Sequence, residues 1–498
     1  MSIVAIQESL RPEIPNIYSN LDYKNFREML IKIDEILIKG GLEDQIIKSA
    51  IEKQLIEKNE SLSRFVNSSE YPRLWKHLRF ALRCNIVRSL TGEALRPFSV
   101  RLSDSALFQW FVGIHHFTEK KSISKSALGE FSKLFDESVI AEQLKIWQSA
   151  FLTDTEQAES LGLNKAICFD DVFLDMTCVK ENIHFPVDWL LLRDAVKSLL
   201  SAIKTIRAQG LKHRMIEPSL LMREMNKLCI AMTHTRRQKD SKRARKSILR
   251  KMKKLSGCIQ KHGVRYRDLL VEKREKTKWT EKQAAQVISR IDHVLNQLPA
   301  AIRQAHERII GERKLSAQEK ILSLYDRDVH VLVRGKADNE VEFGQGFLLA
   351  EQRDGIIVDW ELFKDQPKSD SRLFQPIMKR IQRNYGNILS ATTDRGFDSE
   401  ENRHFVEEQK IFNGLCARSP KRYQGQVKDP VFLELQTRRS QTESRIGIFK
   451  NVFLGRPLKS KGFLHRQMSV TWCVLTHNLW VIARKALSIE REQLKNAA

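Results

Sequence analysis

Apolar residues recur along most of this chain at the spacing of an amphipathic helix. Between residues 21 and 160 they return every three or four positions, which predicts a series of helices. The same spacing returns between residues 190 and 320, where Pro299 is expected to kink or break one helix. Most of the chain is therefore expected to be helical.

Two regions depart from this pattern and carry short apolar runs typical of strands. Residues 166–190 predict one buried strand from Val172 to Val179, and its apolar run contains a single acid, Asp175. After residue 328 strands alternate with helices, and Asp354-Gly355 predicts the turn of a hairpin. The chain is therefore expected to have a mixed α/β fold. The later elements are expected as strands at 329–334, 341–350, 356–362, 388–394 and 411–419, and as helices at 371–384, 398–410, 438–454 and 467–488.

Composition and charge narrow the class of protein. Gly and Pro number 21 and 12 in 498 residues, which excludes collagen-like, linker-like and mostly disordered chains, while a hydrophobic fraction of 42% is enough to build cores. The formal net charge is +24, from 85 Lys and Arg against 61 Asp and Glu, so the expected partner is a polyanion or an anionic surface. The seven cysteines form no C-x-x-C pair and the N-terminus has no signal-peptide pattern, which favours a cytoplasmic location.

The positive charge is concentrated between residues 236 and 254. This segment holds eleven Lys and Arg residues and one acid, Asp240, so water or phosphates must relieve the repulsion. A solvated helix or loop is the simpler alternative. The residues expected to bind DNA in this segment are Arg236, Arg237, Lys242, Arg243, Arg245 and Lys246.

Three acids occupy positions where a carboxylate is unexpected. Asp175 lies inside an apolar strand, Asp394 lies where a strand meets a loop, and Glu443 lies in a cation-rich segment that is otherwise poor in acids. An unpaired buried carboxylate is costly, and a divalent metal that prefers oxygen ligands removes that cost. Two such ions can support phosphoryl transfer. The simpler alternatives are a helix cap at Asp394 and a surface pairing of Glu443 with Arg439 or Lys450.

Several blocks of the sequence resemble bacterial insertion-sequence transposases of the DDE type. Residues 174–194, LDMTCVKENIHFPVDWLLLRD, resemble the first catalytic block of that family, and residues 341–363 resemble the hairpin that follows it. The segment ATTDRGFDSEEN at 391–402 resembles the second catalytic block, and HNLWVIA at 477–483 resembles the closing helix. The blocks occur in the order that the family has.

A fifth block resembles the family signature Tyr-x2-Arg-x3-Glu-x6-Lys. Arg439, Glu443 and Lys450 keep the spacing of this signature, and Gln436 stands at the position of its tyrosine. The chain therefore departs from the family pattern at one residue of the signature.

The resemblance implies a fold, a site and a reaction. The fold would be an RNase H-like catalytic core in which Asp175, Asp394 and Glu443 are the catalytic residues and the ligands of two Mg²⁺ or Mn²⁺ ions, with Arg439 and Lys450 against the DNA. The reaction would be metal-dependent cleavage at transposon ends, followed by transfer of the freed 3′-OH into target DNA. The partners would be DNA and a second copy of the chain, as a homodimer in a synaptic complex that is nucleoid-associated when bound to DNA.

The same blocks suggest how the chain is divided. The core is interrupted by a long basic helical segment, and helical regions precede it. The expected divisions are an N-terminal helical region at 1–60, a candidate DNA-binding domain at 61–160, a split catalytic core at 161–190 and 325–485, a basic helical insertion at 191–324 and a C-terminal tail at 486–498.

Other interpretations stay open at the level of sequence. Asp170 and Asp171 lie close to Asp175, Asp188 is a further acid near the site, and the neighbouring His184 is expected to be structural. A catalytically silent DNA-binding relic, or a repressor of the element, would share every feature except cleavage. A basic helical protein bound to RNA or to a membrane is disfavoured by the β-rich blocks around the acids.

Overall fold

A computed structural model describes residues 14, 17, 19–59, 62–114, 123–235, 240–316, 319–326, 328–333, 341–455 and 457–497. The chain divides into two compact units. Unit 1 consists of Met1–Glu181 together with Gln345–Ala498, and unit 2 is Asn182–Gly344. The segment 191–324 lies inside unit 2.

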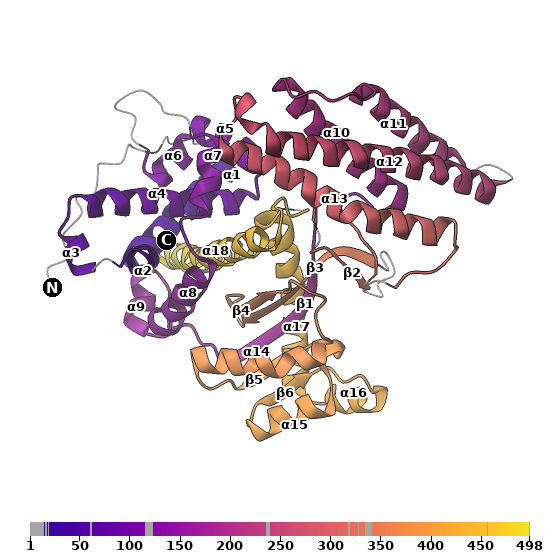
Figure 1. Cartoon of the computed structure of the whole chain (residues 1–498). Helices are drawn as coiled ribbons and strands as arrows, with labels where there is room; N and C mark the ends of the chain where they lie inside the picture. The colour runs from indigo at the N-terminus through magenta and orange to yellow at the C-terminus, as the bar shows by residue number, and fades with distance from the viewer. Residues whose placement is uncertain are drawn as a thin grey trace. The chain divides into compact units, whose positions relative to one another are not determined.

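A mixed β-sheet forms the centre of unit 1 (Figure 1). The strand order is β4-β3-β1-β5-β6, with β5 and β6 parallel to β1 and with β4 antiparallel to β3. Apolar residues cover both faces of β1, as its continuous apolar run predicts. The mixed α/β class expected from the sequence is confirmed. The strands are β1 (Asp171–Lys180), β3 (Val341–Gln352), β4 (Ile357–Leu362), β5 (Ser390–Thr393) and β6 (Phe412–Leu415).

Most of the expected elements have bounds that differ by up to nine residues, and two of these differences have a local cause. The strand expected at 411–419 ends at Leu415, because Ala417 donates its N–H to the Gln426 side chain at 3.0 Å and the chain turns away from the sheet. The helix expected at 438–454 begins at Pro430, because the Asp429 side chain caps it by accepting from the Val431 N–H at 2.8 Å. The helices that follow the hairpin are α14 (Asp370–Tyr385), α15 (Glu400–Glu408), α16 (Pro420–Gln426) and α17 (Pro430–Ile448), which continues as a π-helix, η4 (Phe449–Phe453).

The N-terminal helices pack around the last helix, α18 (Phe463–Ala497), as Figure 1 shows. One apolar core runs from Leu30 to Ala486 and joins these helices to the sheet. Within it the buried Arg83 donates to Asp34 at 2.5 Å and to Glu43 at 2.6 Å. The helices are α1 (Leu21–Lys39), α2 (Leu42–Glu57), α3 (Leu62–Val66), α4 (Glu70–Thr91), α5 (Leu95–Asp104), α6 (Ala106–Val112), α7 (Lys125–Phe131), α8 (Glu137–Phe151) and α9 (Thr155–Ser160).

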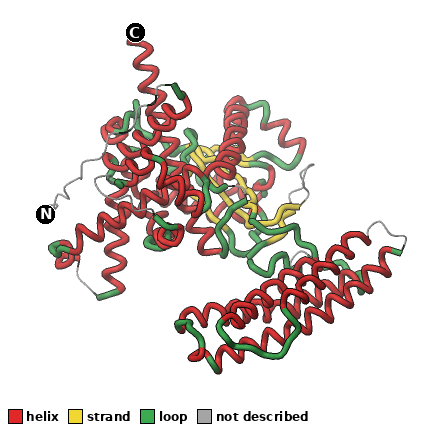
Figure 2. The backbone as a smooth tube through the Cα atoms, turned by 90° about the horizontal axis from the view of Figure 1, so that it is seen from above, coloured by secondary structure: helices red, strands yellow, loops and turns green. Residues whose placement is uncertain are grey.

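Long helices packed side by side make up most of unit 2 (Figure 2). Of the kink or break expected at Pro299, the break does not occur: α13 continues through this residue, and its buried face packs on α10 and α12. A short strand, β2 (His330–Val333), pairs antiparallel with residues 341–344 of β3. None of the described helices carries an apolar stretch long enough to cross a membrane. The long helices are α10 (Asp188–Ala208), α11 (Pro218–His234), α12 (Ser241–Glu272) and α13 (Glu281–Ile309).

Candidate active site

Two of the three predicted acids lie close together where neighbouring parallel strands are paired. The register of β1 and β5 pairs Leu174 with Thr393, so Asp175 on β1 is next to the position of Asp394, the residue that directly follows β5. Neighbouring strands lie about 4.8 Å apart, and residues in register point to the same face. The parallel pairing therefore brings together two carboxylates that are more than two hundred residues apart in the sequence.

Each of these aspartates uses one carboxylate oxygen for a backbone hydrogen bond. Oδ1 of Asp175 accepts from the Met176 N–H at 2.7 Å, and Oδ1 of Asp394 accepts from the Gly396 N–H at 2.8 Å. A side chain at Gly396 would come within 2.6 Å of the Asp370 carboxylate and 3.0 Å of Asp394 Oδ1, so this tight turn requires glycine. The second oxygen of each carboxylate accepts no hydrogen bond from a described residue.

The environment of Asp175 disfavours its ionised form. Burial, followed by the charge of Asp394, raises the pKa of Asp175 to about 6. The Met176 hydrogen bond and the Arg439 charge act in the opposite direction, and the Glu443 charge again raises this pKa. Asp394, Arg439 and Glu443 are thus all close enough to act electrostatically on one carboxylate.

The helix α17 follows the face of β1 that carries Asp175. Residues two apart on a strand share a face, so Phe173 and Thr177 flank Asp175 there. The Arg438 guanidinium lies 4.6 Å from the centre of the Phe173 ring, and Lys450, in the π-helix after α17, donates to the Thr177 hydroxyl at 3.0 Å. The signature residues are therefore laid out along this face.

Gln436 connects the sheet to the signature residues. Its Nε2 donates to the carbonyls of Thr393, at 3.2 Å, and Gly414, at 2.8 Å. Its Oε1 accepts from Arg439 Nε at 3.0 Å, and Arg439 Nη1 donates to Glu443 at 2.9 Å. A tyrosine hydroxyl could not donate to two carbonyls and also accept from Arg439 in this way, because it has a single hydrogen. The sequence identified Gln436 only as a departure from the family pattern and did not indicate this role.

The side of α17 that carries Arg438 is also fixed to the hairpin, by a buried carboxylate that the sequence analysis missed. Glu351 accepts from Arg438 at 2.9 Å, from the Thr442 hydroxyl at 2.7 Å and from Arg445 at 3.1 Å. The hairpin turn needs glycine at Gly355, where φ is +94° and a Cβ would lie 2.5 Å from the Arg445 guanidinium. The spacing of Arg438, Thr442 and Arg445 on one helix face was the available signal.

Comparison with known families agrees with this geometry. Residues 345–479 match the family model described as the transposase DDE domain. The chain contains a DDE-type transposase domain. Its matched segment includes Asp394 and Glu443, whereas Asp175 precedes it. Searches of curated proteins and of solved structures found no match to the chain.

The match supports a transposase function in general, and that family implies DNA binding. Transposases of the DDE type depend on divalent metals, yet no group of three or more His, Cys, Asp or Glu side chains among the described residues is arranged to hold one. Asp175 and Asp394 offer adjacent oxygens whose mutual repulsion a cation would relieve. Glu443 has a side chain 59% exposed and turned towards Arg439. The carboxylate oxygens of Asp175, Asp394 and Glu443 are ligands of the kind that Mg²⁺ or Mn²⁺ prefers.

The other acids near Asp175 in the sequence are occupied by other partners. Asp171 accepts from Arg353 at 2.8 Å, and Asp170 accepts from the thiol of Cys168 at 2.6 Å. Within unit 2, Asp188 accepts from Arg308 at 2.8 Å. These contacts give all three acids structural partners among the described residues.

The residues predicted to bind DNA in the basic segment have several different environments. Arg236 and Arg237 lie outside the described residues. Lys242 and Lys246, on α12, pair with Glu312 at 3.3 Å and 2.9 Å. The other two also lie on α12: Arg245 stacks over the Trp189 ring, and Arg243 is exposed.

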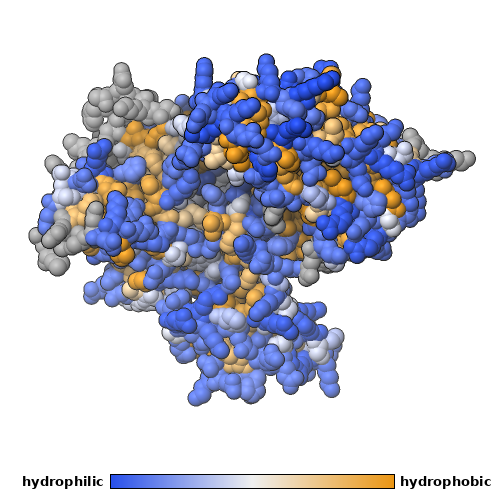
Figure 3. Space-filling view, in the orientation of Figure 1, coloured by the Kyte–Doolittle hydropathy of each residue, from blue (hydrophilic) through white to orange (hydrophobic). Residues whose placement is uncertain are grey.

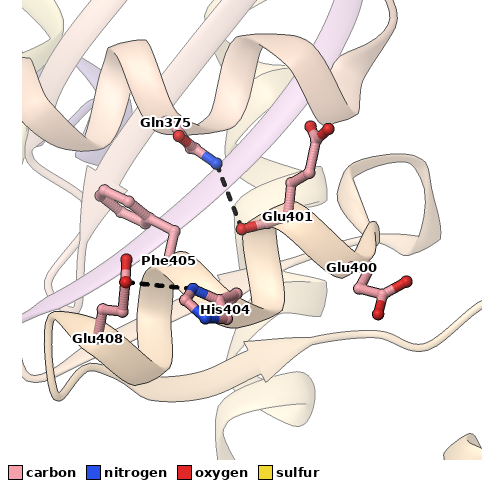
Figure 4. Close-up of a pocket in the computed structure, with 6 residues that line it drawn as sticks. All are labelled: Gln375, Glu400, Glu401, His404, Phe405 and Glu408. Carbon is pink, nitrogen blue, oxygen red and sulfur yellow. Dashed lines mark hydrogen bonds and ion pairs between the residues drawn. The ribbon is translucent and has the colours of Figure 1, made fainter.

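A surface pocket lies away from the predicted site residues. It is formed by α14 and α15, and Figure 4 shows Glu400, Glu401 and Glu408 around it, with His404 paired to Glu408 at 3.4 Å. The surface over α14, α15 and α16 is mostly hydrophilic in the view of Figure 3. None of the predicted catalytic residues lines this pocket, and its carboxylates would repel a nucleic acid.

Proposed function

We propose that this chain is the transposase of a bacterial insertion sequence, and that it cuts DNA at the ends of its element and joins the freed 3′-OH to target DNA. The main support is the adjacency of Asp175 and Asp394 on parallel strands, along a helix that carries Arg439 and Glu443. This arrangement combines acids that can bind metals with cations that can bind phosphodiesters.

In this proposal Asp175, Asp394 and Glu443 are the catalytic acids and hold two Mg²⁺ or Mn²⁺ ions. Bound ions of this kind activate an attacking oxygen and stabilise the leaving oxygen of a phosphodiester. Arg439 and Lys450 hold phosphates of the DNA strand, since both lie on the face of β1 that carries Asp175. The sheet of unit 1 is assigned as an RNase H-like core, interrupted by the basic helices at 191–324.

The assembly and the remaining DNA contacts are part of the same proposal. Two element ends must be brought together, and a homodimer is the simplest assembly that does so. The helical insertion, with Arg236, Arg237, Arg243 and their neighbours, and the region 61–160 are the candidates for holding the ends. Residues 486–497, expected to be a tail, continue α18.

The test is cleavage of labelled DNA that carries the sequences flanking the gene. We expect nicking at the repeat ends with Mg²⁺, no nicking with EDTA, and none with Asp175→Ala. Asp170→Ala is the matched control, because Asp170 lies just before the same strand and contacts Cys168 instead of the site. Binding without nicking under any metal would indicate the silent relic or repressor.

Two further variants test the placement of the metal ligands. Asp394→Ala and Glu443→Gln should abolish strand cleavage and leave end binding largely intact, because neither removes a cation. Cleavage retained in either variant would show that the metal site is misplaced.

A further inference from the structure

The longest helix of unit 2 has one apolar face and one cationic face. The apolar residues of α12, which include Leu249, Met252, Ile259 and Tyr266, are buried against α10, α11 and α13. On its other side are exposed cations, which we name the cation stripe: Arg243, Arg250, Lys254, Lys261 and Arg265.

The cation stripe is straight and continuous. At about 100° of rotation per residue, its members fall within an arc of about 60°, opposite the centre of the buried face. From Arg243 to Arg265 the helix rises about 33 Å at about 1.5 Å per residue. The segment 241–267 contains no Asp or Glu, so no acid of the helix itself interrupts this stretch.

Most of the remaining cations of the same helix differ from the cation stripe in having partners, and the exception is Lys251, which is exposed outside the arc of the stripe. Lys242 and Lys246 pair with Glu312, Lys253 contacts His306 at 3.0 Å, and Arg245 stacks on Trp189. By contrast, no member of the cation stripe forms an ion pair with a described residue. The structure thus separates cations that hold unit 2 together from cations that face solvent.

We propose that the cation stripe binds phosphates of duplex DNA on one side of the duplex, along about one helical turn of its length. This inference rests on the proposed function, because it identifies which surface of the insertion holds DNA. A turn of the duplex is about 34 Å long, which matches the length of the stripe. Duplex DNA carries one negative charge per about 1.7 Å of its axis, counted over both strands, so a row of exposed cations faces a dense anionic surface.

The residues between the cations favour a duplex over other anionic partners. Ser247 and Cys258 complete the stripe, and both are small enough for a backbone to approach closely. Proteins bind single strands by stacking the bases on aromatic side chains, and helices bind membranes through apolar residues that lie beside the cations. Between Arg243 and Arg265 the helix exposes no aromatic ring, and its one exposed large apolar side chain, Val264, lies outside the arc of the stripe.

The experiment compares two variants of equal charge in the full-length protein. The stripe variant is Arg250→Gln/Lys254→Gln/Lys261→Gln. The matched control is Lys204→Gln/Lys227→Gln/Lys282→Gln, which removes three exposed lysines from the neighbouring helices α10, α11 and α13. Fluorescence anisotropy in EDTA measures binding to a duplex of about three helical turns, between about 50 and 200 mM salt. Circular dichroism confirms that both variants are folded.

Losing three phosphate contacts should flatten the plot of log affinity against log salt by about 2.7, at about 0.9 per contact. In the stripe variant we expect this flatter slope and an affinity that is at least about tenfold weaker. In the control variant we expect the slope of log affinity against log salt to differ from that of the wild type by no more than about one. Equal slopes in the two variants would overturn the inference, and so would tighter stripe-dependent binding to duplex RNA.

The inference and the proposed function can fail separately. If cleavage depends on metal but DNA binding does not depend on the cation stripe, only the inference about the stripe is wrong. If DNA binding depends on the cation stripe but no metal supports cleavage, the proposed catalysis is wrong and the inference about the stripe stands.

Discussion

Replacing Asp175 with asparagine should stabilise the metal-free protein. The carboxylate lies partly buried beside Asp394, and burial together with the neighbouring charge raises its pKa to about 6. Ionisation of Asp175 therefore destabilises the folded state. Asparagine has nearly the same shape, keeps an oxygen that can accept from the Met176 N–H, and carries no charge.

The magnitude follows from the shift of the Asp175 pKa from 3.8 to about 6. Because the folded state holds this proton more tightly than the unfolded state, the stability falls as pH rises through this window and remains lower above it. At about 1.4 kcal/mol per pKa unit, the ionised carboxylate costs at most about 3 kcal/mol at neutral pH. Near pH 5 the same relation gives about 1.6 kcal/mol.

Urea unfolding in EDTA, followed by tryptophan fluorescence, measures this effect near pH 7.5 and near pH 5. Asp175→Asn should be about 3 kcal/mol more stable than the wild type at the higher pH and gain about half as much at the lower. Asp171→Asn is the control on the same strand and should lose stability, because it breaks the ion pair with Arg353. A gain that does not depend on pH, or no gain, would refute the reasoning.

The same pair of proteins tests whether Asp175 binds metal. A ligand that binds only the folded state raises the free energy of unfolding with its concentration. Mg²⁺ should therefore stabilise the wild type and Asp171→Asn, and have little effect on Asp175→Asn. Equal stabilisation of all three proteins would place the Mg²⁺ elsewhere.

Three further predictions concern contacts around the site and the core. Gln436→Leu should lower the rate of DNA cleavage about 10- to 100-fold while leaving DNA affinity unchanged, and an unchanged rate would contradict its positioning role. Asn478→Leu should lower the free energy of unfolding by about 1–3 kcal/mol in urea, because it leaves the N–H of Ile357 unpaired in the core and removes one of the two donors to the Ile357 carbonyl. Burial lowers the pKa of His477 from 6.5 to about 4, so between pH 4 and pH 6.5 the unfolded state binds more protons than the folded state. The free energy of unfolding should therefore rise by about 3 kcal/mol as the pH increases from 4 to 6.5. His477→Phe should remove this rise.

The strands and two of the acids could be predicted because their signals are local. Asp175 and Asp394 each interrupt or end an apolar run, and the hairpin was identified by Asp354-Gly355, whose glycine has φ of +94°. What the sequence could not supply is the register. Only the pairing of Leu174 with Thr393 makes neighbours of the two acids.

The two adjacent arginines of α17 show why the rest of the site could not be predicted from the sequence. Arg438 turns to the buried Glu351, whereas Arg439 turns to Gln436 and Glu443. One residue of helix rotation, about 100°, separates these partners. The family spacing identified Arg439, but the structural role of Arg438 depends on where the hairpin lies.

Helix rotation also decides which charges of the basic segment face solvent. Charge density alone selected residues 236–246, yet Lys242 and Lys246 share Glu312, and the exposed cations extend to Arg265. A count of charges treats all of these residues alike. The helical phase separates them, because solvent-facing cations must share one side of the helix.

The energetic cost at Asp175 is itself an argument about function. A fold selected for stability alone would not keep a charged carboxylate beside Asp394, since asparagine would remove the repulsion at little structural expense. Perturbed carboxylates of this kind concentrate at functional sites. Here the cost is accompanied by Arg439, held by Gln436, and by Lys450 on the same face of β1. A divalent cation would turn the repulsion between the aspartates into shared coordination, so the instability of the metal-free site supports the metal-dependent chemistry proposed for it.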